Sequence, residues 1–299
     1  MDIFKDRSQS IWSYADDTTF VDNFVAGDGD AELDVLSRME SLLLEVKDWM
    51  SCNWLKMNDT KTEFIYFGFS KQAAKSFKTS IVVGDCEVKR SDSVKLLGMT
   101  LDSELSLREH IKKKCSAALG NINRIRKISK HLSLESGKTL ASSLILSHFD
   151  YGNSILTGLP DRSLRPLQLL QNYAAKVITK KRKFDSATEA LKEVHWLPIR
   201  QRCQFKILLL TYKALHNLAP EYLKDLLNVK STSYCTRRSN DPLLLHVPFC
   251  YRKTFYERSF SVLAPRLWNN LPFNIRNSTT VTIFKKNLKT HLFKNAFSV

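Results

Sequence analysis

Short apolar stretches in the first hundred residues alternate polar and apolar side chains, a spacing typical of β-strands with one covered face. In residues 10–24, SIWSYADDTTFVDNF, β-branched and aromatic residues flank an Asp-Asp pair and predict a β-hairpin. Residues 80–88, SIVVGDCEV, predict a second hairpin that turns at Gly84-Asp85. Residues 62–68, TEFIYFG, and 93–101, SVKLLGMTL, each predict one strand.

Helical spacing starts at residue 31, where apolar side chains recur every three or four positions to about residue 54, and Asp30 is suited to cap that helix. After Asp102 this spacing dominates, and a helix of about five turns begins near Leu107. Further helices are predicted at residues 134–148, 162–179, 201–216 and 283–293, with a short one after Pro220. Residues 228–280 are richer in Pro, Ser and Asn and predict short strands and turns.

These elements predict an α+β fold, with strands and one long helix first and a mostly helical region after them. The chain has 299 residues, of which 43% are hydrophobic, so it has enough apolar material for a core. The change of period places the expected boundary between these two parts after Asp102.

Charge is distributed unevenly between the two ends of the chain. The formal net charge is +16. Residues 1–100 hold 12 Lys/Arg against 17 Asp/Glu, whereas residues 101–299 hold 34 against 13. This distribution indicates cation handling by the first part and contact with a polyanion by the second. The alternative is a basic protein whose lysines are merely solvated. The basic run 180–183 likewise could be a nuclear-import patch or a solvated helix end.

No sequence feature indicates a membrane or secreted protein. No apolar run approaches the roughly 18 residues that a spanning helix needs. The sequence MDIFKDRSQS has no apolar core of a signal peptide. The six cysteines are scattered without a CxxC motif, which favours free thiols in a reducing compartment. We therefore expect an intracellular protein, nuclear or cytoplasmic, that is not secreted.

The pair Asp16-Asp17 has two interpretations. Aspartate tolerates tight-turn backbone angles and bonds its own backbone, so the pair could serve the turn alone. Alternatively, a strand pair holds both carboxylates rigidly at a sheet edge, which suits Mg²⁺, a hard cation that takes oxygen ligands. A two-metal site of this kind would require at least one further carboxylate from another strand.

Several motifs, in order along the chain, carry a resemblance to a known family. YADD (14–17) resembles the polymerase motif of reverse transcriptases. WLKMNDTKTEF (54–64) and VKLLGMTLDSELSLREHI (94–111) are similar to the segments that follow it in non-LTR retrotransposons. The later segments FDYGNSILTGLP, LQLLQNYAAKVI, VHWLPIRQRCQFKILLLTYKALHNLAPEYL and SFSVLAPRLWNNLPFNIRNSTTVTIFKKNLKTHLF resemble the thumb and tail of LINE-type elements, with the jockey, chicken-repeat and L2-like branches most similar.

The resemblance implies an architecture and a set of roles. Residues 1–102 would be a partial palm, 103–183 a helical thumb and 184–299 a C-terminal tail region. Asp16 would be the principal metal-binding aspartate and Asp17 its neighbour, with Mg²⁺ as the cofactor. The implied nucleotide and primer contacts are Tyr14, Ala15, Lys61, Leu97 and Gly98. Lys61 could equally be a solvated lysine, and Gly98 could mark a bulge.

The implied partners are an RNA template and an RNA–DNA hybrid or DNA primer. Their phosphates would contact the polar face of the first thumb helix, at Lys112, Lys113, Lys114, Arg124 and Lys127.

The match departs from the family before Tyr14. The family's first catalytic aspartate and its fingers lie upstream of YADD, whereas thirteen residues precede Tyr14 here. They include Asp2 and Asp6, and Asp2 is a poor substitute for the missing carboxylate. We therefore expect the product of a 5′-truncated reading frame, inactive alone as an RNA-directed DNA polymerase. A non-catalytic module that binds RNA or a hybrid, and a transposon remnant without function, are the alternatives.

Overall fold

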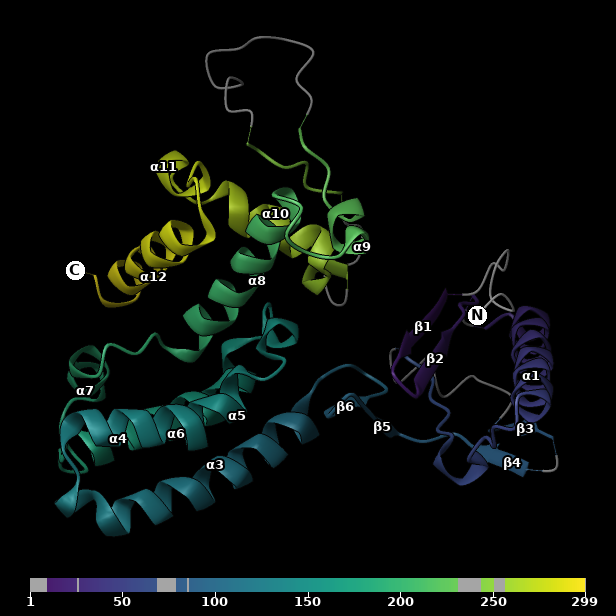
Figure 1. The fold of residues 1–299 in the computed structure, drawn as a ribbon, viewed down its shortest axis with the longest axis horizontal. Coiled ribbons are helices and arrows are strands. Elements are labelled where there is room, and N and C mark those ends of the chain that lie inside the picture. The colour runs from purple at the N-terminus through teal and green to yellow at the C-terminus, as the bar shows by residue number, and fades with distance from the viewer. Residues whose placement is uncertain are drawn as a thin grey trace. The chain divides into compact units, whose positions relative to one another are not determined.

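The computed structural model describes residues 10–25, 27–68, 79–84, 86–230, 243–249 and 256–298. It is a mixed α and β structure with small antiparallel sheets, which confirms the predicted α+β class (Figure 1). The chain divides into two compact units, unit 1 from Met1 to Leu107 and unit 2 from Arg108 to Val299. Whether these units are a palm, a thumb and a tail remains a prediction.

The strands of unit 1 form separate antiparallel hairpins. The bounds are β1 Ser10–Tyr14 with β2 Asp17–Val21, β3 Ser80–Val83 with β4 Cys86–Lys89, and β5 Ser93–Leu96 with β6 Met99–Asp102. The hairpins predicted around the Asp-Asp pair and in residues 80–88 are confirmed, although Asp85 lies outside the described residues.

The single strand predicted for residues 93–101 is wrong, because the chain reverses at Leu97-Gly98. Leu96 pairs with Met99, and both turn residues have positive φ, 45° at Leu97 and 78° at Gly98. A turn with two positive φ angles matches the twist of the strands it joins, and glycine adopts such an angle without steric cost. Gly98 therefore marks a turn and not a bulge within one strand.

The strand predicted for residues 62–68 is also wrong. In that segment only Phe64 forms a bridge, to Arg90. Its aromatic side chains account for the apolar pattern, since Phe64 is buried and packs edge-on against Tyr66. Apolar residues here reflect core packing without regular strand pairing.

Helix α1, Gly29–Cys52, covers the β3–β4 hairpin. Its N-cap is Asp28 and not the predicted Asp30, because the Asp28 side chain accepts a hydrogen bond from the Ala31 amide at 3.1 Å. The buried core of unit 1 consists of Leu36, Leu43, Phe64, Ile81, Val83 and Val88.

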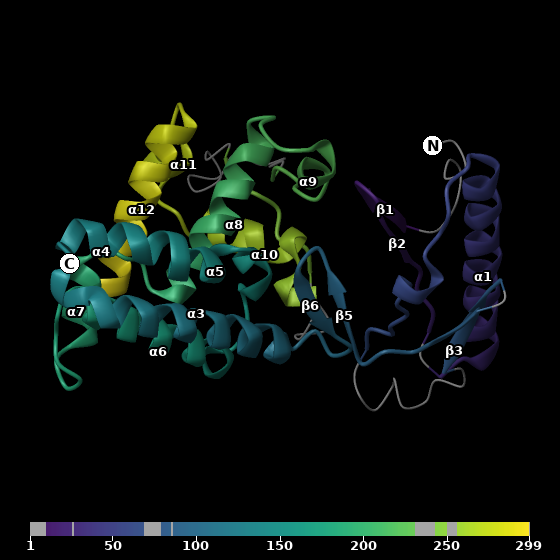
Figure 2. The same cartoon turned by 60° about the horizontal axis from the view of Figure 1, so that its bottom comes forward.

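Unit 2 is a helical assembly (Figures 1 and 2). Its helices are α3 Arg108–Ile128, α4 Leu134–Ala141, α5 Ser147–Asp150, α6 Asp161–Ile178, α7 Ala187–Glu193, α8 Ile199–Leu215, α9 Glu221–Asp225, α10 Phe260–Asn269, α11 Phe273–Arg276 and α12 Val281–Phe297. A π-helical segment, Ser142–Leu146, joins α4 to α5, and 3₁₀ turns lie at Ser129–His131, Asn153–Leu156 and Tyr256–Arg258. The helices predicted from the apolar spacing are present.

Aromatic side chains hold α8, α10 and α12 together. The ring of Tyr212 in α8 stacks on Phe284 in α12 with centroids 4.2 Å apart, and Trp268 in α10 lies 5.9 Å from Phe284. The Tyr212 hydroxyl donates to the Ser278 carbonyl at 2.8 Å, so its buried polar atom has a partner.

The short strands predicted for residues 228–280 are wrong for the described part of that range. Among the described residues of this range, the only β-pairing is a bridge between Val229 and Leu245. Helices α10 and α11 occupy the end of the range. Val262, Ala264 and Trp268 are buried in α10, and Pro265 is buried with them inside the helix. The Pro, Ser and Asn content of this range therefore concealed the helical spacing of α10 in the sequence analysis.

No helix in the described ranges is both long and apolar enough to cross a bilayer.

Two helical glycines of unit 2 give a matched test of this packing. At Gly120 in α3 an added methyl group meets no atom within 4 Å, so Gly120→Ala should raise the free energy of unfolding by about 0.5–1 kcal/mol through higher helix propensity. At Gly137 in α4 the methyl group would lie 3.0 Å from Cγ2 of Ile178, which must shift to make room, so Gly137→Ala should raise stability less than Gly120→Ala does. Chemical denaturation followed by circular dichroism measures both, and equal effects would contradict the packing of α4 on α6.

Candidate functional site

The β1–β2 hairpin presents the aspartate pair at its tip. Tyr14 pairs with Asp17 across the strands, which leaves Ala15 and Asp16 as a two-residue loop. Ala15 has φ of 53°, an angle that alanine adopts at a cost of roughly 1–2 kcal/mol. All four side chains are exposed, and the strand pattern on both sides predicts this exposure for Asp16 and Asp17.

Sequence analysis missed Trp12, which lies on the same face of the hairpin as Tyr14 and Asp17. Trp12 and Tyr14 are two residues apart on β1, and Asp17 faces Tyr14, so the three side chains share one side of the pleat. The two aromatic side chains are 54% and 68% exposed. This spacing of two was visible in the sequence and could have identified Trp12.

A salt bridge ties the base of this hairpin to α1. The Arg38 guanidinium donates to Asp22, just after β2, at 3.1 Å and to Asp34, one turn earlier in α1, at 2.5 Å. The Asp22 side chain is only 10% exposed, whereas the Arg38 side chain is 43% exposed, so water screens this ion pair in part. Phe20 adds an apolar contact with the core of unit 1. These contacts fix the direction of the hairpin relative to α1.

The metal-binding interpretation of Asp16 and Asp17 lacks a third ligand in the described ranges. Across those ranges no group of three His, Cys, Asp or Glu side chains is close enough to hold a metal ion. The upstream carboxylates Asp2 and Asp6 lie outside the described residues. The described carboxylates of the hairpin therefore do not complete a two-metal site by themselves.

The other implied nucleotide and primer contacts lie on separate elements of unit 1. Lys61 ends a 3₁₀ turn, Asp59–Lys61, where it is exposed and its amide donates to the Asn58 carbonyl at 3.0 Å. Leu97 and Gly98 form the tip of the β5–β6 hairpin. The structure thus brings Tyr14, Ala15, Asp16 and Asp17 together in one hairpin. It leaves Lys61, Leu97 and Gly98 on elements that do not share a sheet with them.

Helix α3 presents a basic face, but Lys114 does not belong to it. Lys112, Lys113, Arg124 and Lys127 are exposed. Lys114 is half-buried, with its ammonium 4.8 Å from the centre of the Tyr151 ring, and burial lowers the pKa of its ammonium group. The helical period explains this difference, because Lys114 is turned about 100° from Lys113, toward the buried side chains Ala118 and Ile125. The prediction that Lys112, Lys113 and Lys114 share one exposed face is therefore wrong for Lys114, and only Lys112 and Lys113 of the three remain on it.

The charge division follows the structural units. Residues 108–299 carry 34 Lys/Arg against 11 Asp/Glu, and residues 1–107 carry 12 against 19. Unit 2 therefore generates a positive potential that attracts polyanions, whereas unit 1 is acidic.

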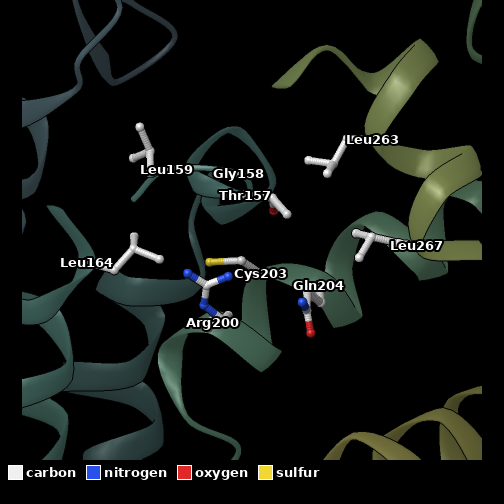
Figure 3. A pocket seen from close by; sticks show the side chains of 9 residues that line it. All are labelled: Thr157, Gly158, Leu159, Leu164, Arg200, Cys203, Gln204, Leu263 and Leu267. Carbon is white, nitrogen blue, oxygen red and sulfur yellow. The ribbon is translucent and has the colours of Figure 1, made fainter. Parts of the chain in front are cut away.

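A pocket of about 120 Å³ in unit 2 does not have the chemistry of an active site (Figure 3). Leucine side chains, Cys203, Gln204 and Arg200 line it, and Arg200 donates to Asp161 at 2.9 Å. Burial and the nearby Asp150 carboxylate raise the pKa of the Cys203 thiol to about 12, so it stays protonated at neutral pH. A protonated thiol is a weak nucleophile, which argues against covalent catalysis here.

The described cysteines Cys52, Cys86, Cys115 and Cys203 are free thiols, as the sequence predicts. Cys235 and Cys250 lie outside the described residues.

Comparisons with models of known protein families, with curated proteins and with solved structures found no match. The resemblance to reverse transcriptases therefore rests on the motifs alone.

The Asp22–Arg38 salt bridge generates a prediction about the hairpin. Asp22→Asn should weaken the attachment by about 1 kcal/mol, so that amide hydrogens in β1 and β2 exchange roughly fivefold faster. Asp34→Asn is the matched control, because it removes the other carboxylate from the same arginine without touching the hairpin. Hydrogen exchange followed by mass spectrometry measures these rates. Equal changes in both variants would mean that the Asp22–Arg38 salt bridge does not hold the hairpin.

Proposed function

We propose that this chain is part of the reverse transcriptase of a non-LTR retrotransposon, an RNA-directed DNA polymerase. In this proposal unit 1 is a partial palm, and unit 2 is the thumb and C-terminal region. The single observation that carries the proposal is the two-residue hairpin that presents Asp16 and Asp17 beside the exposed Tyr14 ring. Carboxylates held rigidly at an exposed tip suit a divalent cation that also binds phosphate oxygens.

Asp16 and Asp17 would be the Mg²⁺ ligands, and Tyr14 with Ala15 would lie against the nucleotide or primer. Magnesium supplies charge neutralisation at the phosphates when it is bound. The β5–β6 hairpin, with Leu97 and Gly98 at its tip, would contact the primer, and Lys61 would contact the incoming nucleotide. A glycine at a hairpin tip allows a second backbone to approach closely, which supports this role for Gly98.

A second candidate is a non-catalytic module that binds RNA or an RNA–DNA hybrid through unit 2. The excess of 34 basic over 11 acidic residues in residues 108–299 favours it, as does the exposed face of α3 with Lys113, Arg124 and Lys127. The two candidates share this binding surface and differ only in the chemistry at the hairpin.

Because the described residues supply only two carboxylates at the hairpin, we expect the 299-residue chain alone to be inactive. Two exposed carboxylates bind Mg²⁺ weakly, and positioning supplies much of the rate of phosphoryl transfer, so half a site should not keep a useful fraction of it. A primer-extension assay on an RNA template should give no product with Mg²⁺ or Mn²⁺. Template-dependent extension that Asp16→Ala abolishes would prove the prediction wrong and would mean that another carboxylate completes the site.

The corrected face of α3 predicts how binding responds to salt. Each phosphate neutralised on a duplex adds about −0.9 to the slope of log K against log salt. Combined Lys113→Gln, Arg124→Gln and Lys127→Gln substitutions should flatten the slope by roughly 2 to 3 units. Lys114→Gln is the matched control and should leave the slope unchanged, because Lys114 covers Tyr151. A triple variant with the parent slope would place the binding surface elsewhere.

A further inference from the structure

The connection between α6 and α7, residues 179–186, combines positive charge with an exposed aromatic ring. Four consecutive basic residues, 180–183, precede Phe184, and the Phe184 side chain is 92% exposed. The Lys183 ammonium lies 5.6 Å from the centre of that ring. A phenylalanine so exposed buries little apolar surface, and what distinguishes Phe184 is the row of cations beside its ring.

Backbone contacts fix the shape of this connection. Lys180 takes a left-handed backbone angle, φ 56°, and the amide of Lys181 donates to the Lys176 carbonyl at 2.9 Å, which together close the C-terminus of α6. The Lys176 ammonium donates to the Lys183 carbonyl at 2.8 Å, and the Arg182 amide donates to the Asp185 carboxylate at 2.6 Å. Phe184 is therefore presented from an ordered turn.

The four basic residues have different roles. The Lys181 ammonium lies 3.1 Å from Glu193 and 3.9 Å from Glu189, both in α7, so its charge is used within the fold. Lys180, Arg182 and Lys183 are exposed, and their side chains make no ion pair with a described carboxylate. Three cations thus remain available around one aromatic ring.

The connection lies at the same end of unit 2 as the C-terminus of α3. Arg126, in the last turn of α3, donates to the Tyr173 hydroxyl of α6 at 3.1 Å. Gly137, in the α4 helix that follows, lies against Ile178, the last residue of α6. Figures 1 and 2 both show the α6–α7 connection beside the end of α3. The C-terminus of α3 and the α6–α7 connection therefore lie at the same end of unit 2.

We propose that residues 180–184 bind unpaired nucleotides of a nucleic acid strand, with the Phe184 ring stacked on a base and Lys180, Arg182 and Lys183 beside its phosphates. The inference rests on the proposed function insofar as unit 2 binds nucleic acid, and it adds a single-stranded contact to the duplex contact on α3. Positive charge that follows the backbone, combined with an aromatic ring that stacks on bases, is how proteins bind single strands without sequence preference. An acidic protein partner would pair with the cations but would gain nothing specific from the planar ring, which argues against a protein as the occupant. Membrane insertion normally uses a larger apolar face than one side chain.

The test uses the full chain and two probes, a 20-nucleotide oligouridine RNA and a blunt RNA–DNA hybrid of the same length. Phe184→Ala should weaken binding of the single strand about tenfold, the scale expected for the loss of one stacked base, and leave hybrid binding unchanged. Phe184→Leu should weaken it similarly, because leucine is apolar but has no π-face. Phe184→Trp should keep the affinity, and its added fluorescence should fall as RNA binds.

Phe273→Ala is the matched control, because Phe273 is a half-exposed aromatic residue at the start of α11, and the substitution should leave oligouridine affinity unchanged. The inference is overturned if Phe184→Ala or Phe184→Leu binds oligouridine as tightly as the parent chain. It is also overturned if Phe273→Ala weakens oligouridine binding as much as Phe184→Ala does. It is also overturned if Phe184→Ala releases the chain from phosphatidylserine vesicles while RNA binding persists. Failure of the parent chain to bind the hybrid would contradict the proposed function instead, so the two failures are distinguishable.

Discussion

The packing of α3 against α6 determines which charges of unit 2 face solvent. Ala118 in α3 and the neighbouring Ala174 and Ala175 in α6 are almost completely buried, and such small side chains let two helices approach closely. This contact fixes the rotation of α3 about its axis, because Ile122 and Ile125 must also stay covered. Arg124 and Lys127 then point away from α6, and Lys114 lies at the boundary over Tyr151. Both nucleic-acid proposals for unit 2 depend on that rotation.

Unit 1 depends on a different constraint, the attachment of separate hairpins to one helix. An isolated two-stranded hairpin is at best marginally stable in water. The β3–β4 hairpin buries Ile81, Val83 and Val88 against α1, whereas the β1–β2 hairpin is attached through Phe20 and the Asp22–Arg38 bridge. The first hairpin is thus held mainly at its base. Such an attachment leaves the tip exposed, as a tip that contacts a ligand must be.

The sequence predicted the elements whose apolar residues form a single stripe. For α3, α6 and α8 the spacing of buried residues alone placed each helix within a few residues of its bounds. Prediction failed where the chain turns back within an apolar stretch, and where polar residues and prolines interrupt the spacing of a helix. Leu97-Gly98 turns within a continuous apolar run, and Leu97 takes a positive φ that no rule for leucine predicts. Helix α10 lies in the range 228–280, whose Pro, Ser and Asn content predicted short strands and turns, although the buried Trp268 packs the helix into the core.

Two signals for missed features were present in the sequence. Ser186 and Glu189 form an S-x-x-E pattern, and the Ser186 side chain does cap α7 by accepting from the Glu189 amide at 3.3 Å. The alternation that predicted the first hairpin also placed Trp12 on the face of Tyr14. For the candidate site, the sequence predicted the exposed tip with Asp16 and Asp17 and most of the basic face of α3. It did not separate Lys114 from Lys113, because that difference depends on which side of α3 packs against the fold.

The opposite charges of the two units impose a condition on any function that uses both. A nucleic acid attracted by the basic face of α3 would be repelled by the exposed carboxylates of Asp16 and Asp17, since both are negative. Repulsion of this kind becomes attraction only where a divalent cation lies between carboxylate and phosphate, because the cation is then the largest local charge. Binding by unit 2 needs no such ion and loses strength with any salt. The acidic tip therefore has a use in nucleic-acid chemistry only together with a divalent cation, and without one it opposes the contact that unit 2 favours.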